Sequence, residues 1–159
     1  MPVFLAAMLA ASAAHADAFV VTKSENRNEV RYAVRLDGSC QPVGSAPVTP
    51  YWRMVEKGGA EESLLGIEEP AYGVAWQSVS SGGAGGSVRL ALRAVPDRVI
   101  RIDAWRVAGG CAVVASTMIE GVAAALQEVH VTVGFLGPAK IEVLGNAREG
   151  GRPLHEVLR

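Results

Sequence analysis

The chain has 159 residues, of which 50% are hydrophobic, and a formal net charge of −1 at pH 7. This length supports one domain with its own core and is short for two. Nucleic acids and anionic membranes are normally met by a clear basic excess, so the near-zero net charge excludes a general electrostatic attraction to either. Frequent glycine and proline with period-two apolar patterning favour short strands, and we expect an all-β, single-domain protein.

Residues 1–16 carry an apolar run that ends in Ala14-His15-Ala16, the small-x-small pattern read by signal peptidase. We expect cleavage between Ala16 and Asp17, which leaves residues 17–159 as one β domain in the periplasm or outside the cell. No Lys or Arg precedes the run, so the true start codon can lie upstream. A buried helix or a membrane anchor is disfavoured because the run is too short to span a bilayer and polar sequence follows it. We therefore expect no transmembrane segment in the mature chain.

The first clear strand covers residues 29–36, where apolar side chains at Val30, Tyr32, Val34 and Leu36 alternate with mostly polar ones. A pleated strand would place one set inward and the other in water. The polar residues before it favour a turn, so residues 18–22 and this strand are predicted to form a hairpin.

The middle of the chain is less regular. Residues 47–56 predict a strand with prolines at its start, residues 61–67 one helical turn, and residues 71–79 an extended segment. Residues 80–86 are glycine-rich and predict a flexible loop. A phosphate-binding loop is disfavoured there, since no Lys-Ser/Thr pair follows the glycines and a strand comes next.

A second hairpin is predicted from residues 87–94 and 99–107, with Pro96-Asp97 as its turn. Residues 111–126 fit either a helix or two strands; Gly121 and the β-branched residues favour strands.

Further strands are predicted at residues 129–135, 139–144 and 153–158. About nine strands at regular spacing indicate an antiparallel β-sandwich, with a β-barrel as the alternative.

The two cysteines, Cys40 and Cys111, both lie beside predicted turns in the exported part of the chain. In an oxidising compartment the simplest outcome is one disulfide between them. A catalytic or metal-binding role is disfavoured, because the sequence has no CxxC pair and no Cys/His cluster.

Three groups of short motifs carry a family resemblance: residues 23–32, Pro47-Val48 followed by Tyr51-Trp52-Arg53, and Leu64 followed by residues 71–74. They resemble the bacterial exported family DUF4833, which has a similar serine-and-asparagine turn before a Val-x-Tyr strand, a Tyr-Trp strand and an Ala-Tyr-Gly segment. The resemblance implies an exported small domain. It implies no activity, because DUF4833 is a domain of unknown function.

Catalytic signals are weak. A hydrolase needs a nucleophile, a base and an orienting acid, and the exported part offers only His130 and His155, with no Gly-x-Ser-x-Gly elbow. Surface histidines are the favoured interpretation, and their spacing to carboxylates is equally poor for zinc. We predict no catalytic residue, no metal site and no cofactor, and lean against an enzyme.

Binding signals are somewhat stronger. Aromatic side chains beside loops can stack on sugars or anchor a partner, although tryptophans in small β domains are more often core. The polar turn is either self-bonded or the rim of a site. The predicted binding residues are Lys23, Ser24, Asn26, Asn28, Tyr51, Trp52 and Tyr72.

The favoured function is a binding or interaction module whose partner is a glycan or an envelope protein. The alternatives are a small hydrolase-type enzyme with an unrecognised site and a barrel that holds a small apolar ligand.

Overall fold

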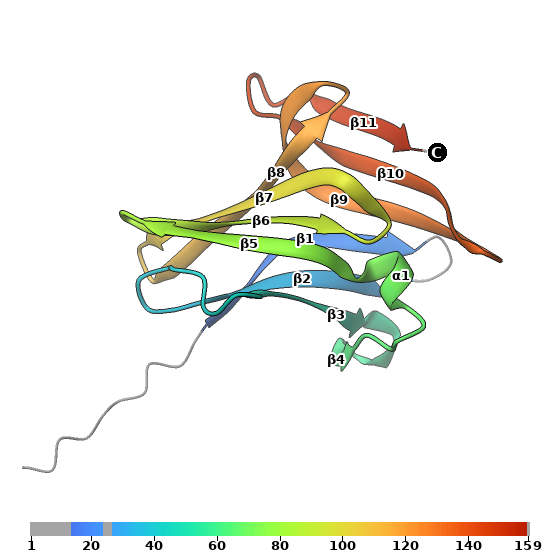
Figure 1. The fold of residues 1–159 in the computed structure, drawn as a ribbon, viewed down its shortest axis with the longest axis horizontal. Coiled ribbons are helices and arrows are strands. Elements are labelled where there is room, and N and C mark those ends of the chain that lie inside the picture. Colours follow the sequence, from blue (N-terminus) through green and yellow to red (C-terminus); the bar gives the residue numbers. More distant parts are fainter. Residues whose placement is uncertain (1–13, 24–26, 159) are drawn as a thin grey trace, which may run out of the picture.

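The computed structural model describes residues 14–23 and 27–158, and this part of the chain is mainly β-structure (Figure 1). The prediction of an all-β domain is confirmed, with eleven strands in the described part instead of about nine. The strands are β1 (Ala14–Lys23), β2 (Glu29–Leu36), β3 (Val48–Met54), β4 (Ala60–Ser63), β5 (Val74–Gly82), β6 (Gly85–Leu92), β7 (Val95–Val107), β8 (Gly110–Ile119), β9 (Val122–Gly134), β10 (Gly137–Ala147) and β11 (Pro153–Leu158). The helical pieces are a 3-10 turn, η1 (Val55–Lys57), and α1 (Glu69–Tyr72).

All eleven strands belong to one hydrogen-bonded sheet. Its main path runs β4-β3-β2-β1-β9-β8-β7-β6-β5, and β10 and β11 extend it from the other edge of β9. The sheet folds over itself, so that β5, β6 and β7 face β1, β2 and β3 as two layers (Figure 1). The β-barrel alternative is wrong, because β4 and β5, the ends of the path, do not pair with each other. The sheet is also mixed and not purely antiparallel, since β1 runs parallel to β9.

The core lies between the two layers and follows the alternation of the strands. In β2 the inward residues Val30, Tyr32, Val34 and Leu36 are fully buried, as the sequence pattern predicts. The facing layer contributes Leu90 and Ile100, paired across the β6–β7 hairpin, and these are equally buried. Burying side chains of this size is the main favourable contribution to folding.

Three local predictions are wrong. Of residues 61–67, expected to make a helical turn, 61–63 belong to β4 and 64–67 form the loop before α1, and α1 replaces the start of the expected extended segment. Pro70 suits the first turn of α1, because its missing N–H would have no intrahelical partner there. The β6–β7 turn is Arg93-Ala94, and Pro96-Asp97 lies within β7. This is tolerated because β7 pairs with β8 only from Arg101 onward, so the missing N–H of Pro96 removes no bond from that ladder.

The predicted loop at residues 80–86 is shorter than expected. Strand β5 continues to Gly82 and β6 starts at Gly85, so only Gly83 and Ala84 connect them. A Cβ at Gly85 would lie 1.9 Å from the carbonyl oxygen of Ala104. Glycine is therefore required in the strand for close approach of the backbones, and its presence there does not signal a flexible loop.

Strand β9 is where the two layers join. Strand β10 pairs along one edge of β9. The other edge is shared: residues 122–125 pair with β8, and residues 128–131 pair with β1. From this shared edge β8 continues into the layer of β5, β6 and β7, which we call the upper layer. Strand β1 continues into the layer of β2 and β3, the lower layer, and the sheet forks.

A disulfide and side-chain hydrogen bonds link the layers away from the fork. The predicted disulfide between Cys40 and Cys111 is present, with Cα atoms 5.6 Å apart, and joins the loop after β2 to the start of β8. It spans 71 residues of sequence, for which the chain-entropy model gives a stabilisation of about 4 kcal/mol. The side-chain amide of Gln77 on β5 forms a second link. It accepts from the N–H of Val48 at 2.9 Å and donates to the C=O of Val48 at 3.1 Å.

The predicted leader overlaps the first strand. Residues 1–13 lie outside the described residues, whereas Ala14–Ala16 pair with Val34–Leu36 at the start of β1. Within the described residues, no helix combines the length and apolar character needed to cross a bilayer.

Replacing Gln77 with Ala should destabilise the fold by about 1–3 kcal/mol, because both backbone groups of buried Val48 would lose their partner at the seam between β3 and β5. Urea unfolding followed by tryptophan fluorescence measures the change. Gln127→Ala, at an exposed position of β9, is the matched control and should cost less than about 0.5 kcal/mol. Equal losses in the two variants would contradict this role of Gln77.

Candidate functional site

The residues predicted to bind a partner fall into separate places. Ser24, Asn26 and the side chain of Lys23 lie outside the described residues. Trp52 and Tyr72 meet edge to face, with ring centroids 5.2 Å apart, and both are buried. Tyr51 neighbours Trp52 in the strand and therefore projects from the opposite, outer face of the sheet. The structure thus brings together only part of the predicted group.

Trp52 and Asn28 line a small hollow of about 210 Å³ at the edge of the lower layer. The indole N–H of Trp52 donates to Glu68 Oε2 at 3.0 Å, and the N–H of Leu65 donates to the same oxygen at 2.8 Å. The indole is therefore bonded within the chain and serves the core. The hydroxyl of Tyr72 has no hydrogen-bond partner among the described residues, and burial raises its pKa.

Tyr51 belongs to a polar network on the outer face of β1, β2 and β3. Its hydroxyl donates to Asp17 Oδ1 at 2.7 Å, while Arg31 donates to Asp17 Oδ2 at 2.7 Å. Burial and the hydrogen bond to Asp17 raise the pKa of Tyr51 to about 12, so the phenol stays protonated at neutral pH. The surface hollow beside it, of about 520 Å³, is also lined by His15 and Glu61.

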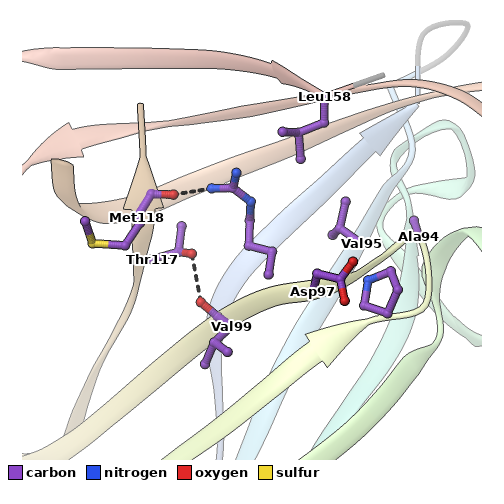
Figure 2. Close-up of a pocket in the computed structure, with 9 residues that line it drawn as sticks. Ala94, Val95, Asp97, Val99, Thr117, Met118 and Leu158 are labelled. Carbon is purple, nitrogen blue, oxygen red and sulfur yellow. Dashed lines mark hydrogen bonds between the residues drawn. The ribbon is translucent and has the colours of Figure 1, made fainter. Parts of the chain in front are cut away.

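A hollow lies where β7 and β8 separate, between the start of β7, the end of β8 and the end of β11 (Figure 2). The ladder between β7 and β8 stops at Arg101 and Ser116, and side chains connect the strands beyond that point. The hydroxyl of Thr117 donates to the C=O of Val99 at 2.8 Å, and Arg98 donates to the C=O of Met118. We call this hollow the fork pocket.

The fork pocket has a volume of about 590 Å³ and mainly apolar walls. Val99 and Met118 line it and are 37% and 53% exposed. The full lining consists of Ala94, Val95, Pro96, Asp97, Arg98, Val99, Thr117, Met118 and Leu158. A largely apolar cavity with a few converging polar groups is the usual form of a small-molecule site.

A partly buried ion pair supplies the charge in the fork pocket. Arg98 Nη2 lies 2.8 Å from Glu156 Oε1, and the two side chains are only 16% and 26% exposed. Glu156 Oε2 also accepts from the N–H of Glu120 at 2.9 Å, which ties β11 to the β8–β9 turn. Burial works against the charged carboxylate, but the bonds from Glu120 and Arg98 outweigh it and lower the pKa of Glu156. Arg98 Nε is buried and bonds to no described residue.

His130 and His155 each contact a polar side chain of a neighbouring strand. His130 Nδ1 lies 2.8 Å from the hydroxyl of Thr22, and that hydroxyl donates its proton to Glu128. The ring nitrogen must then donate to the hydroxyl, so it is not placed to act as the general base for Thr22. His155 on β11 lies 3.1 Å from Glu142 on β10. Across the described strands and turns, no three His, Cys, Asp or Glu side chains form a metal-binding group.

The sequence analysis missed Arg98, Glu156 and Met118. A signal for Arg98 was present, because it lies two and four residues before the inward-facing Ile100 and Ile102 and therefore belongs to the inward face of its strand. Nothing comparable marked Glu156, which depends on how β11 is placed.

Replacing Glu156 with Gln should cost about 1–2 kcal/mol at pH 7, because a charge-assisted pair is removed from a largely buried place. The pKa of Glu156 is lowered by folding, so its contribution is present above the unfolded-state pKa and is lost as pH falls through the folded pKa. The wild type should therefore lose more stability than Glu156→Gln between about pH 5 and pH 3. Urea titrations across this pH range measure the free energy of unfolding of each variant, with exposed Glu149→Gln as the control. If the free energy of unfolding of wild type and of Glu156→Gln changed in parallel with pH, the prediction would be refuted.

Comparison with known proteins shows to which family the chain belongs. No curated protein and no solved structure matched the chain. The family model described as a domain of unknown function, DUF4833, matches residues 19–156 and so covers nearly the whole chain, from β1 to β11. The resemblance that the sequence motifs indicate is confirmed: the chain belongs to the DUF4833 family.

Proposed function

We propose that this protein is an exported binding module of the bacterial cell envelope, and that it holds a small, mainly apolar ligand in the fork pocket. The observation that carries the proposal is the cavity itself: about 590 Å³, with apolar walls and one partly buried arginine. Binding sites for small molecules combine these features.

Export is supported by two independent features. The apolar run before Asp17 ends in a signal-peptidase pattern. The disulfide between Cys40 and Cys111 is of a kind that persists in oxidising compartments such as the periplasm. Cleavage would remove Ala14–Ala16 from β1, but the parallel pairing of β1 with β9 begins only at Val20 and would be kept.

The charges in the fork pocket narrow the chemistry of the ligand. Arg98 is already neutralised by Glu156, and Asp97 stands exposed at the rim, so an anion would meet no net positive charge. A neutral ligand fits better, because the walls of the pocket are mainly apolar. The ligand we propose is therefore a neutral, mainly apolar molecule.

A glycan is the second candidate ligand, on the outer face around Tyr51. Tyr51, Asp17 and Arg31 present an aromatic ring, a carboxylate and a guanidinium side by side. Sugars are commonly held by stacking on such rings and by paired polar groups. Of the three aromatic residues predicted to bind a partner, only Tyr51 belongs to this second candidate site. Trp52 and Tyr72 pack in the core.

Export is tested by expressing the 159-residue chain with its own leader in a Gram-negative host. We expect a periplasmic protein whose intact mass corresponds to residues 17–159. The mass should be lower by two hydrogens than that of the reduced chain, because the disulfide forms in the periplasm. Mass spectrometry of the periplasmic and cytoplasmic fractions measures both features. An uncleaved chain confined to the cytoplasm would contradict export.

Ligand binding is tested with N-phenyl-1-naphthylamine, a neutral apolar dye that becomes fluorescent when it leaves water. Wild type should bind the dye, and Val99→Trp should weaken binding by at least about tenfold, because the larger side chain fills the rim of the pocket. Val107→Trp is the matched control: Val107 is exposed at the other end of β7 and should leave binding unchanged. No dye binding by the wild type, or equal loss in both variants, would reject the fork pocket as the site.

A further inference from the structure

Five consecutive hairpins, from β5 to β10, are each closed by a two-residue turn. Four of these turns contain small or charged residues, as solvent-exposed turns usually do: Gly83-Ala84, Arg93-Ala94, Ala108-Gly109 and Glu120-Gly121. The fifth, between β9 and β10, is Phe135-Leu136. This apolar tip is the exception in the series.

Turn geometry does not explain the apolar tip. Two-residue hairpin turns favour Asn, Asp and Gly, which adopt left-handed conformations or bond to the nearby backbone. Phe135 and Leu136 do neither, and they are 102% and 96% exposed, the most exposed large apolar side chains in the described part of the chain. They therefore contribute nothing to the core and remain available for an external contact.

The surroundings of the tip are apolar or basic. Val133 is 41% exposed, and Ala139 is exposed on the other strand of the hairpin. Between residues 131 and 141 the sequence contains no carboxylate; Lys140 is the first charged residue below the tip, and its ammonium lies 3.0 Å from Glu142 Oε1. An apolar end with a lysine behind it is the arrangement that favours insertion at a membrane interface.

A second apolar protrusion lies toward the same end of the molecule. Leu65 and Ile67, in the loop before α1, are 65% and 87% exposed. Pro70 of α1 and Pro138 of β10 line one shared hollow, which places α1 beside the tip end of the β9–β10 hairpin. In Figure 1 the tip of this hairpin and α1 both point to the right-hand end.

We propose that this end of the protein binds a phospholipid bilayer, with Phe135 and Leu136 inserted among the lipids and Lys140 at the headgroups. A bilayer fits better than a protein partner for two reasons. The tip is convex and needs no matching pocket in a bilayer. Its two side chains offer on the order of 300–400 Å² of apolar surface, well below the roughly 800 Å² that each partner buries in a stable protein interface. Because the chain has almost no net charge, insertion is driven by apolar contact and depends little on salt.

Co-sedimentation with phosphatidylcholine vesicles, with and without a minor fraction of phosphatidylglycerol, tests the proposal. All variants carry the same apolar residues 1–16, so any vesicle binding by these residues is the same in every variant. Phe135→Ser combined with Leu136→Ser should lower the vesicle-bound fraction at least about tenfold at limiting lipid. Serine suits a turn, so the unfolding midpoint should not change. Val107→Ser, at the opposite end of the sandwich, should bind like the wild type.

A local probe removes the remaining ambiguity. Tryptophan emission of Leu136→Trp should shift to the blue when vesicles are added, whereas Val107→Trp should show no such shift. Absence of the shift at residue 136, or equal vesicle binding by the serine variant and wild type, would overturn the proposal. A blue shift that instead appears on raising the protein concentration without lipid, together with a dimer in sedimentation velocity that the serine variant lacks, would assign the tip to self-association and also overturn it.

Discussion

The architecture depends on one shared edge. A strand edge can satisfy only one hydrogen-bonding neighbour at each position, and β9 divides its inner edge between β8 at residues 122–125 and β1 at residues 128–131. The two neighbours must diverge from that point, one into each layer, and this divergence produces the sandwich from a single sheet. Backbone groups without a neighbouring strand occur elsewhere in the sheet, at the end of β8 and at Val48 on β3. In both places a long polar side chain takes the role of the missing strand: Arg98 donates to Met118, and Gln77 bonds both backbone groups of Val48.

The fork pocket forms at a different divergence, that of β7 from β8. Where β7 separates from β8, the space between them is lined by side chains that would otherwise pack against a neighbouring strand. The pair of Arg98 and Glu156 closes the far side, and a pair so removed from water is often no more stabilising than apolar side chains of the same volume. Its position is better explained by specificity. It fixes β11 against the β8–β9 turn and leaves one guanidinium N–H unused. A site could form here without any strained backbone or dedicated loop.

Local patterns in the sequence predicted local structure well and long-range pairing poorly. The alternation in Val30–Leu36 and in the β6–β7 hairpin gave the correct inward faces, because burial on one face of a strand leaves a period of two. The parallel pairing of β1 with β9 joins residues more than a hundred positions apart and leaves no local trace, so the fork could not be anticipated. The predicted grouping of Tyr51 with Trp52 and Tyr72 does not occur in the structure, for a related reason. Tyr51 and Trp52 are adjacent in the sequence, and adjacency in a strand places side chains on opposite faces. Phe135 continues the alternation of Val129, Val131 and Val133, and only the hairpin register shows that it has left the strand.

The fork pocket and the apolar tip are close to each other, and this connects the two proposals. Ala94, Val95 and Leu158 line the fork pocket and also a neighbouring hollow, which is lined as well by Pro138 to Ile141 at the tip end of the β9–β10 hairpin. From Lys140 to Leu136 the hairpin extends roughly 13 Å. A tip inserted in a bilayer would therefore hold the fork pocket near the headgroups. An apolar ligand that is scarce in water is concentrated in lipid, so a pocket at that height would meet it at the membrane surface. Val99 and Met118, exposed at the rim, provide an apolar path for its entry.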